Sequence, residues 1–176
     1  MKVILSKPVR QPRLRDRQVL LRVLREAAEL TQLARVPGFG GAAELHVVLV
    51  GSRTMARLNA DFLGHAGSTD VLAFELAGDG ATPGPFVAGE IYLCPAVAAV
   101  AALRFGTSLA EECVLYAVHG MLHLTGLDDA EPAGRRAMRR AERRVMGRLR
   151  ASADFGAIFG NSAVGPRPQG GGGGAA

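Results

Sequence analysis

The sequence predicts an α+β fold in which a small mixed four-stranded sheet is covered by about five helices. Short apolar segments and longer segments with helical periodicity follow one another in irregular order, separated by glycine and proline clusters. At 176 residues the chain can bury a core of its own, so we expect a single domain over residues 1–151. Residues 152–176 end in a glycine- and proline-rich stretch and are expected to be a disordered tail.

Four short apolar segments are the predicted strands, at residues 3–5, 45–50, 71–76 and 90–93. The second is rich in β-branched residues and is bounded by Gly51, which is typical of a buried strand. His46 lies in this segment and is therefore expected to pack in the core. The stretch 77–85 is rich in glycine and proline and is expected to be a loop.

Five segments carry helical signals, at about residues 16–33, 53–62, 95–104, 108–124 and 132–150. Ser52 is expected to cap the second helix, and Ser108 and Glu111 predict a capping box at the start of the fourth. Gly126 lies just beyond the fourth helix, where a left-handed residue commonly ends a helix. Pro132 marks the start of the last helix, in which arginines surround an apolar stripe.

The composition excludes several classes of protein. Cys94 and Cys113 are too few for a disulfide scaffold and are not spaced as a thiolate metal site, so we expect reduced thiols. No apolar run reaches the roughly 18 residues of a membrane span, and the first residues are too short in their apolar part for a secretory signal, which predicts a cytoplasmic protein without a membrane partner. All but two of the 21 basic side chains are arginine; this favours a polyanionic partner, although compositional bias explains it equally well.

The most informative segment is HGMLHLTGLDD, residues 119–129. His119 and His123 are four residues apart on a predicted helix, so both imidazoles project from one face and can bind one metal ion. Gly126 permits a turn that returns Asp129 as a third ligand, leaving a fourth tetrahedral position for water, as in catalytic zinc sites. The alternative is that both histidines are satisfied by hydrogen bonds in the core and that Asp129 caps the next helix.

Two families share this spacing of ligands. The metzincin peptidases carry a glutamate directly after the first histidine as general base, whereas this chain has Gly120 there. The other is the YbeY family of rRNA-maturation endoribonucleases, with the signature His-Gly-x-Leu-His-Leu-x-Gly-x-Asp-His. The chain resembles that signature from His119 through Asp128, and Asp129 replaces the last histidine.

The resemblance to the YbeY family extends to other motifs in the expected order. Leu58-Asn59 followed by STDVLAF, residues 68–74, is similar to Leu-Asn followed by Pro-Thr-Asp-Val-Leu-Ser-Phe. Gly89-Glu90-Ile91 is similar to the Gly-Asp-Ile start of a family strand. Together the similar motifs cover about residues 44–149.

The resemblance implies a metal-dependent endoribonuclease that cleaves single-stranded regions of rRNA in rRNA maturation and ribosome assembly. It implies one Zn²⁺ per chain, bound by His119, His123 and Asp129, with rRNA and the ribosome or a ribosomal subunit as partners. A carboxylate in place of a histidine lowers the charge of the zinc site by about one unit and would admit Mn²⁺ more readily. No side chain is a clear general base, so a metal-bound water or an activated 2′-hydroxyl is expected to be the nucleophile.

Further candidates surround the three ligands. Asp128 is expected either to orient a ligand or to cap the helix at Pro132. Glu112 lies seven residues before His119 on the same helix face, where it could hydrogen-bond a histidine or form a solvated salt bridge. The candidate substrate-binding residues are Thr69, Asp70, His65, Arg53 and Arg57.

One departure from the family concerns its phosphate-binding arginine, which is replaced here by Leu63. His65, Arg53 or Arg57 would have to take its place, or turnover is impaired. The arginines of the last helix and Arg104 could hold an RNA backbone or form an ordinary solvated surface. Two other functions stay open: a non-catalytic ribosome-assembly factor with a structural metal, and a metallopeptidase with a different general base.

Overall fold

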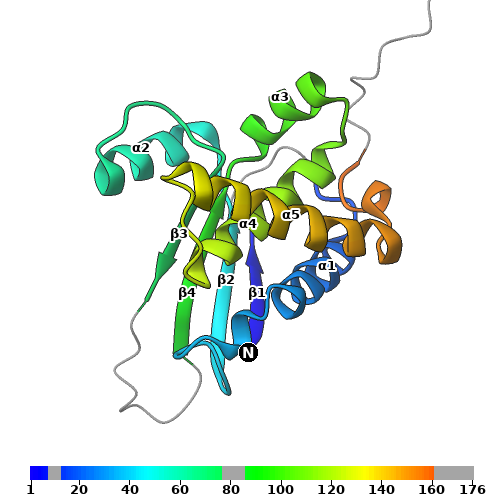
Figure 1. Ribbon diagram of the computed structural model, residues 1–176. Helices are drawn as coiled ribbons and strands as arrows, with labels where there is room; N and C mark the ends of the chain where they lie inside the picture. Colours follow the sequence, from blue (N-terminus) through cyan, green and yellow to red (C-terminus); the bar gives the residue numbers. More distant parts are fainter. Residues whose placement is uncertain (8–12, 77–85, 161–176) are drawn as a thin grey trace, which may run out of the picture.

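The computed structural model describes residues 1–7, 13–76 and 86–160 and contains a four-stranded mixed sheet (Figure 1). The strands are β1 (Lys2–Ser6), β2 (Ala43–Leu49), β3 (Val71–Glu75) and β4 (Phe86–Leu93), in the spatial order β1-β2-β4-β3. β1, β2 and β4 are parallel, and β3 pairs antiparallel with β4 at the edge of the sheet. The predicted α+β class with a mixed sheet of four strands is confirmed.

The helices are α1 (Arg17–Leu30), α2 (Ser52–Leu63), α3 (Pro95–Phe105), α4 (Leu109–Leu124) and α5 (Pro132–Ser152), with short 3₁₀ turns at Leu33–Arg35 and Phe155–Ala157. α4 is the central helix, because it contacts β3 and β4 on one side and α1, α3 and α5 on the others (Figure 1). Within the described residues, none of the helices combines the length and apolar character needed to cross a bilayer.

Local sequence signals position α4 accurately. The predicted capping box is present, since the Ser108 side chain accepts from the Glu111 backbone and the Glu111 carboxylate accepts from the Ser108 backbone. Gly120 faces the sheet, where an added Cβ would lie 3.1 Å from Ile91 Cγ2 and 3.2 Å from Val71 Cγ2. The absence of a side chain at this position therefore lets α4 lie close to β3 and β4.

The core lies mainly between the sheet and the layer of α1, α4 and α5. Alternate residues of β2, such as Leu45 and Val47, point into this core. His46 points to the opposite face, where its Nε2 lies 3.2 Å from Glu44 Oε2 and its side chain is partly exposed. The prediction that His46 packs in the core is wrong, because strand alternation gives it the opposite face from its buried neighbours.

Two other predictions about local structure need correction. Gly51, not Ser52, occupies the cap position of α2, and the Ser52 hydroxyl lies instead 3.7 Å from Cys94 Sγ. The segment 152–160 is part of the fold rather than of a disordered tail, since Ile158 is fully buried and its carbonyl accepts from the Arg15 backbone at 2.9 Å. The remainder of the predicted tail, 161–176, and the predicted loop 77–85 lie outside the described residues. Both cysteines are free and buried.

Candidate metal centre

The end of α4 and the turn after it bring three potential metal ligands together. One ligand atom from each of His119, His123 and Asp129 can be chosen so that all lie within 4.8 Å of one another. The two Nε2 atoms are 2.9 Å apart, and Asp129 oxygens lie 3.9 Å from His119 Nε2 and 3.7 Å from His123 Nε2. Ligand atoms bound at about 2.0–2.1 Å around a tetrahedral ion are about 3.3 Å apart, so the observed spacings bracket those of a zinc site.

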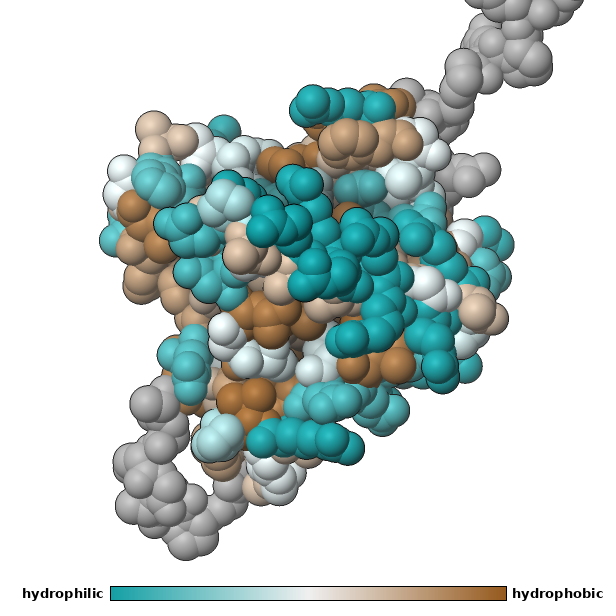
Figure 2. Space-filling view, viewed as in Figure 1, coloured by the Kyte–Doolittle hydropathy of each residue, from teal (hydrophilic) through white to brown (hydrophobic). Residues whose placement is uncertain are grey.

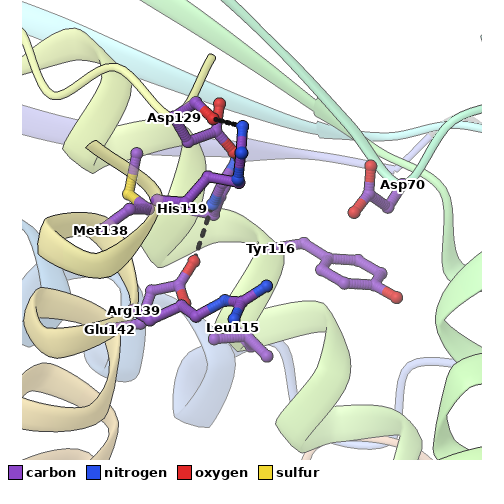
Figure 3. A pocket seen from close by; sticks show the side chains of 9 residues that line it. Asp70, Leu115, Tyr116, His119, Asp129, Met138, Arg139 and Glu142 are labelled. Atoms are coloured by element: carbon purple, nitrogen blue, oxygen red, sulfur yellow. Dashed lines mark hydrogen bonds and ion pairs between the residues drawn. The ribbon is translucent and has the colours of Figure 1, made fainter. Parts of the chain in front are cut away.

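Hydrogen bonds at Nδ1 of each ring fix the orientation of the two imidazoles. His119 Nδ1 lies 2.7 Å from Glu142 Oε1 (Figure 3), and His123 Nδ1 lies 2.9 Å from the Leu127 carbonyl oxygen. Both partners are acceptors, so in the neutral form of each ring Nδ1 carries the hydrogen and Nε2 has the lone pair. At 2.9 Å the two Nε2 atoms are close enough to share a proton or to bind one ion together with Asp129. The chemistry of this donor set therefore fits a divalent metal ion.

The turn after α4 is built by local backbone bonds. Gly126 has φ +88°, and its N–H donates to the His123 carbonyl at 2.8 Å. The Leu127 N–H donates to the Leu122 carbonyl at 3.1 Å, which completes a Schellman motif at the end of α4. This ending turns the chain back, so that Asp129 returns to the level of the histidines.

Contacts with the first turns of α5 hold Asp129 in place. Arg135 Nη1 donates to the carbonyl oxygens of Asp129, at 3.2 Å, and of Ala130. A Cβ added at Gly134 would lie only 2.1 Å from the Asp128 carbonyl oxygen, so this loop rests directly on the helix. Asp129 is thus positioned by α5 as well as by the turn that precedes it.

Two of the three residues, His119 and Asp129, open onto a pocket between α4 and α5, lined by Asp70, Leu115, Tyr116, His119, Asp129, Arg135, Met138, Arg139 and Glu142. Figure 3 shows Asp70 and Tyr116 across the pocket from Asp129 and Met138. Burial lowers the pKa of His119, but the hydrogen bond and charge of Glu142, with the charges of Asp129 and Asp70, outweigh it and raise that pKa overall. Burial, with the nearby charges of Asp70 and Glu112, raises the pKa of Tyr116 to about 12, so its hydroxyl stays protonated at neutral pH.

Of the residues proposed to surround the ligands, Asp70 lies in the pocket with His119 and Asp129. Its Oδ1 accepts from the Val71 backbone and from the Thr69 hydroxyl, both at 2.9 Å. These bonds orient the Asp70 carboxylate at the start of β3. Thr69 is not among the pocket-lining residues, and its link to the pocket is its hydrogen bond to Asp70.

The structure gives Glu112 and Asp128 neither of the contacts expected for them. Glu112 is only 5% exposed and accepts from the Thr107 hydroxyl at 2.6 Å. It does not reach His119, because seven residues of helix separate the two by about 10 Å along the axis. Asp128 accepts from the Ala130 backbone at 3.0 Å, and Glu131 occupies the cap position of α5.

The basic candidates on and after α2 do not line the pocket. Arg53 and Arg57 are exposed on α2, and Leu63 at its end is 53% exposed. The His65 carbonyl accepts from the Asn59 side chain at 3.2 Å, which holds the loop that follows α2. The cations that do line the pocket come from α5.

The sequence did not single out Tyr116 or Glu142, and it indicated Arg135 and Arg139 only as members of the arginine-rich last helix. A signal existed for Glu142, which is the sole acidic residue of the arginine-rich helix and directly follows Ala141 of the apolar stripe. An isolated carboxylate at the edge of a buried face commonly has a specific partner.

Comparison with known proteins agrees with this geometry. Residues 10–150 match the family model described as Endoribonuclease YbeY. A protein of that name from Rhodococcus erythropolis is 45% identical over 104 residues, which cover 55% of this chain and 58% of the relative. One from Salinispora tropica is 42% identical over 125 residues, covering 65% and 80%.

The fold is also found among solved structures. The solution structure of TM1509 from Thermotoga maritima aligns with a TM-score of 0.52 at 24% identity, covering 85% of this chain and 92% of that protein. The similarity at this level concerns the fold alone. Family membership rests instead on the match across residues 10–150 and on the relatives above: the chain belongs to the YbeY endoribonuclease family.

Proposed function

We propose that this chain is a metal-dependent endoribonuclease that cleaves single-stranded regions of rRNA during rRNA maturation. The observation that carries the proposal is the pair of facing Nε2 atoms, 2.9 Å apart, with the Asp129 carboxylate beside them at an open pocket. In this proposal His119, His123 and Asp129 bind one Zn²⁺, and Mn²⁺ is the alternative ion. When bound, a divalent ion supplies Lewis acidity, which stabilises charge that develops on a phosphoryl oxygen.

The remaining residues of the pocket would prepare the site for that chemistry. Glu142 would hold the hydrogen of His119 on Nδ1 and so keep Nε2 directed at the ion. The Leu127 carbonyl would do the same for His123. Tyr116, protonated at neutral pH, would offer a hydrogen-bond donor to the substrate from the opposite wall.

The peptidase alternative requires a general base at a position other than 120, because the packing of Gly120 leaves no room for one there. An added Cβ at this position would meet Ile91 and Val71 of the sheet, so a general base there would disturb the contact between α4 and the sheet. The second alternative, an assembly factor with a structural metal, is disfavoured by three protein ligands at an open pocket, since structural zinc sites are closed by a fourth protein ligand.

The partners in this proposal follow from the family. They are rRNA as substrate and the ribosome or a ribosomal subunit as the assembly on which it acts, in the cytoplasm. The matched segments span 58% of the Rhodococcus relative and 80% of the Salinispora relative, and the activity is accordingly proposed for this chain rather than transferred to it.

A cleavage assay with metal analysis tests the function. Zinc-loaded protein is incubated with rRNA fragments that contain single-stranded regions, with and without a chelator, and the zinc content is measured by elemental analysis. We expect chelator-sensitive cleavage and about one zinc per chain, both lost in His123→Ala. His46→Ala is the matched control, because His46 lies on the other face of the sheet and should keep both properties.

Each other outcome selects a different interpretation. Full zinc content in His123→Ala would refute the ligand assignment. Bound zinc with no cleavage of any fragment would favour the assembly factor, and chelator-sensitive cleavage of casein would favour the peptidase.

A further inference from the structure

The charge on α5 is concentrated in two rows of arginines. The helix contains eight arginines, and Glu142 is its only acidic residue. Seven of the arginines recur every four residues, a step of about 6 Å along the axis. We call Arg135, Arg139 and Arg143 the pocket row, and Arg136, Arg140, Arg144 and Arg148 the outer row.

The pocket row begins inside the candidate metal centre. Arg135 and Arg139 line the pocket together with His119 and Asp129, whereas no residue of the outer row lines it. Arg143 follows Arg139 on the same flank of the helix, one turn farther from Asp129. Figure 2 shows that hydrophilic side chains gather over α5 on the face seen in Figure 1. The cationic surface is thus continuous with the pocket.

The guanidinium groups of Arg139 and Arg143 are free to bind a ligand. Both residues are exposed, and neither side chain has a hydrogen bond or ion pair with any residue that the structure describes. Arg150 differs, since its Nε donates to Glu111 Oε1 at 2.9 Å. Arg135 uses Nη1 for two carbonyl oxygens and keeps its other donors. Unpaired arginines placed one turn apart can each bind a separate phosphate with a planar pair of donors.

We propose that the pocket row binds the phosphates of a single-stranded RNA that flank the phosphate at the metal centre. The inference rests on the proposed function, because the reacting phosphodiester must lie in the pocket from which this row starts. An acidic protein could match the same charge, but its binding would not depend on the pocket, so it would not favour the pocket row over the outer row. Bound RNA would favour the pocket row, because its backbone is continuous with the phosphate that reacts in the pocket.

The outer row supplies a matched control for the test. Arg139→Ala/Arg143→Ala and Arg140→Ala/Arg144→Ala remove the same charge from exposed positions of one helix, and alanine favours the helix in both. Binding of a short fluorescein-labelled 2′-O-methyl oligouridine to zinc-loaded protein is measured by anisotropy over a range of salt concentrations. Gel analysis afterwards verifies that the probe is intact, and thermal unfolding verifies that both variants are folded.

For the pocket-row variant we expect the slope of log K against log salt to fall in magnitude by about 1.4, since each phosphate contact to a single strand contributes about 0.7. Affinity at low salt should fall about tenfold or more, with less than half of either change in the outer-row variant. Arg139→Lys/Arg143→Lys should recover most of the slope, because lysine keeps the charge.

Two results would overturn the inference. Equal losses in both double variants would mean that RNA responds only to total charge. Unchanged binding in both would mean that α5 serves another partner, such as an acidic protein. Chelator-sensitive cleavage by the wild-type chain in either case would leave the proposed function intact, whereas a wild-type chain that neither binds nor cleaves RNA would overturn both.

Discussion

The hydrogen bond between Glu142 and His119 should set the affinity of the metal centre. The two side chains are 19% and 22% exposed, and the Nδ1–Oε1 distance is 2.7 Å, so the bond is charge-assisted and partly shielded from water. Hydrogen bonds to charged groups contribute about 1.5–3 kcal/mol. If most of this is lost when the carboxylate is removed, zinc affinity should fall about 10- to 100-fold, the usual effect of removing such an orienting group.

Two substitutions separate the charge of Glu142 from its geometry. Glu142→Gln keeps an acceptor for His119 Nδ1 but removes the charge, so we expect a loss near the lower end of that range. Glu142→Ala also releases the ring, which can then place its hydrogen on Nε2 and turn away from the ion, so the loss should be larger. Glu29→Gln, at an exposed position on α1, is the control for loss of an acidic side chain.

Zinc affinity is measured by competition with a chelating dye, which does not depend on any enzymatic activity. Wild-type affinity in both Glu142 variants would refute the reasoning, since the hydrogen bond would then neither orient nor strengthen the ligand. A loss of the same size in Glu29→Gln would attribute the effect to net charge instead.

Further predictions concern the support of the site and the fold. Gly134→Ala should weaken zinc binding, because its Cβ would lie 2.1 Å from the Asp128 carbonyl oxygen. Gly147→Ala, with nothing within 4 Å of its Cβ, should raise the free energy of unfolding by up to about 1 kcal/mol in thermal unfolding. Unchanged zinc affinity in Gly134→Ala, or destabilisation by Gly147→Ala, would contradict the packing. The hydrogen bond from Arg150 lowers the pKa of Glu111, so the ionised Glu111 stabilises the fold above pH 4.5 and this stabilisation is lost as the pH falls through the folded pKa. In urea titrations at several pH values, Glu111→Gln should lose less stability in acid than the wild type. The same pH profile in both proteins would contradict this prediction. Ile158→Ala should cost about 2–5 kcal/mol in urea unfolding if residues 152–160 belong to the core, and a loss below 0.5 kcal/mol, typical of surface positions, would contradict this.

Local signals were sufficient for the elements that carry the site. The spacing of four residues predicted that His119 and His123 share one face of a helix, and Gly126 predicted the turn that returns Asp129. Both inferences depend on contacts within about ten residues of chain, which the backbone geometry of a helix and its ending largely determines. The capping box of α4 was predicted for the same reason.

The residues around the three ligands depended on how helices pack. Glu142 lies 23 residues from His119 and reaches it because α5 packs against α4 with its carboxylate-bearing edge turned inward. Glu112 shares the helix face of His119 but lies two turns away, and its carboxylate is bonded to Thr107 instead.

The sequence by itself thus determined most helices and strands, the set of candidate ligands and the family, because these follow from short-range periodicity and ordered motifs. Only the tertiary structure decided which side chains complete the pocket and which face of the sheet is covered, as for Glu142, Arg139 and His46. The physical reason is that the rotation of a helix about its axis, and the side of a sheet that is buried, are set by packing against distant segments rather than by neighbouring residues.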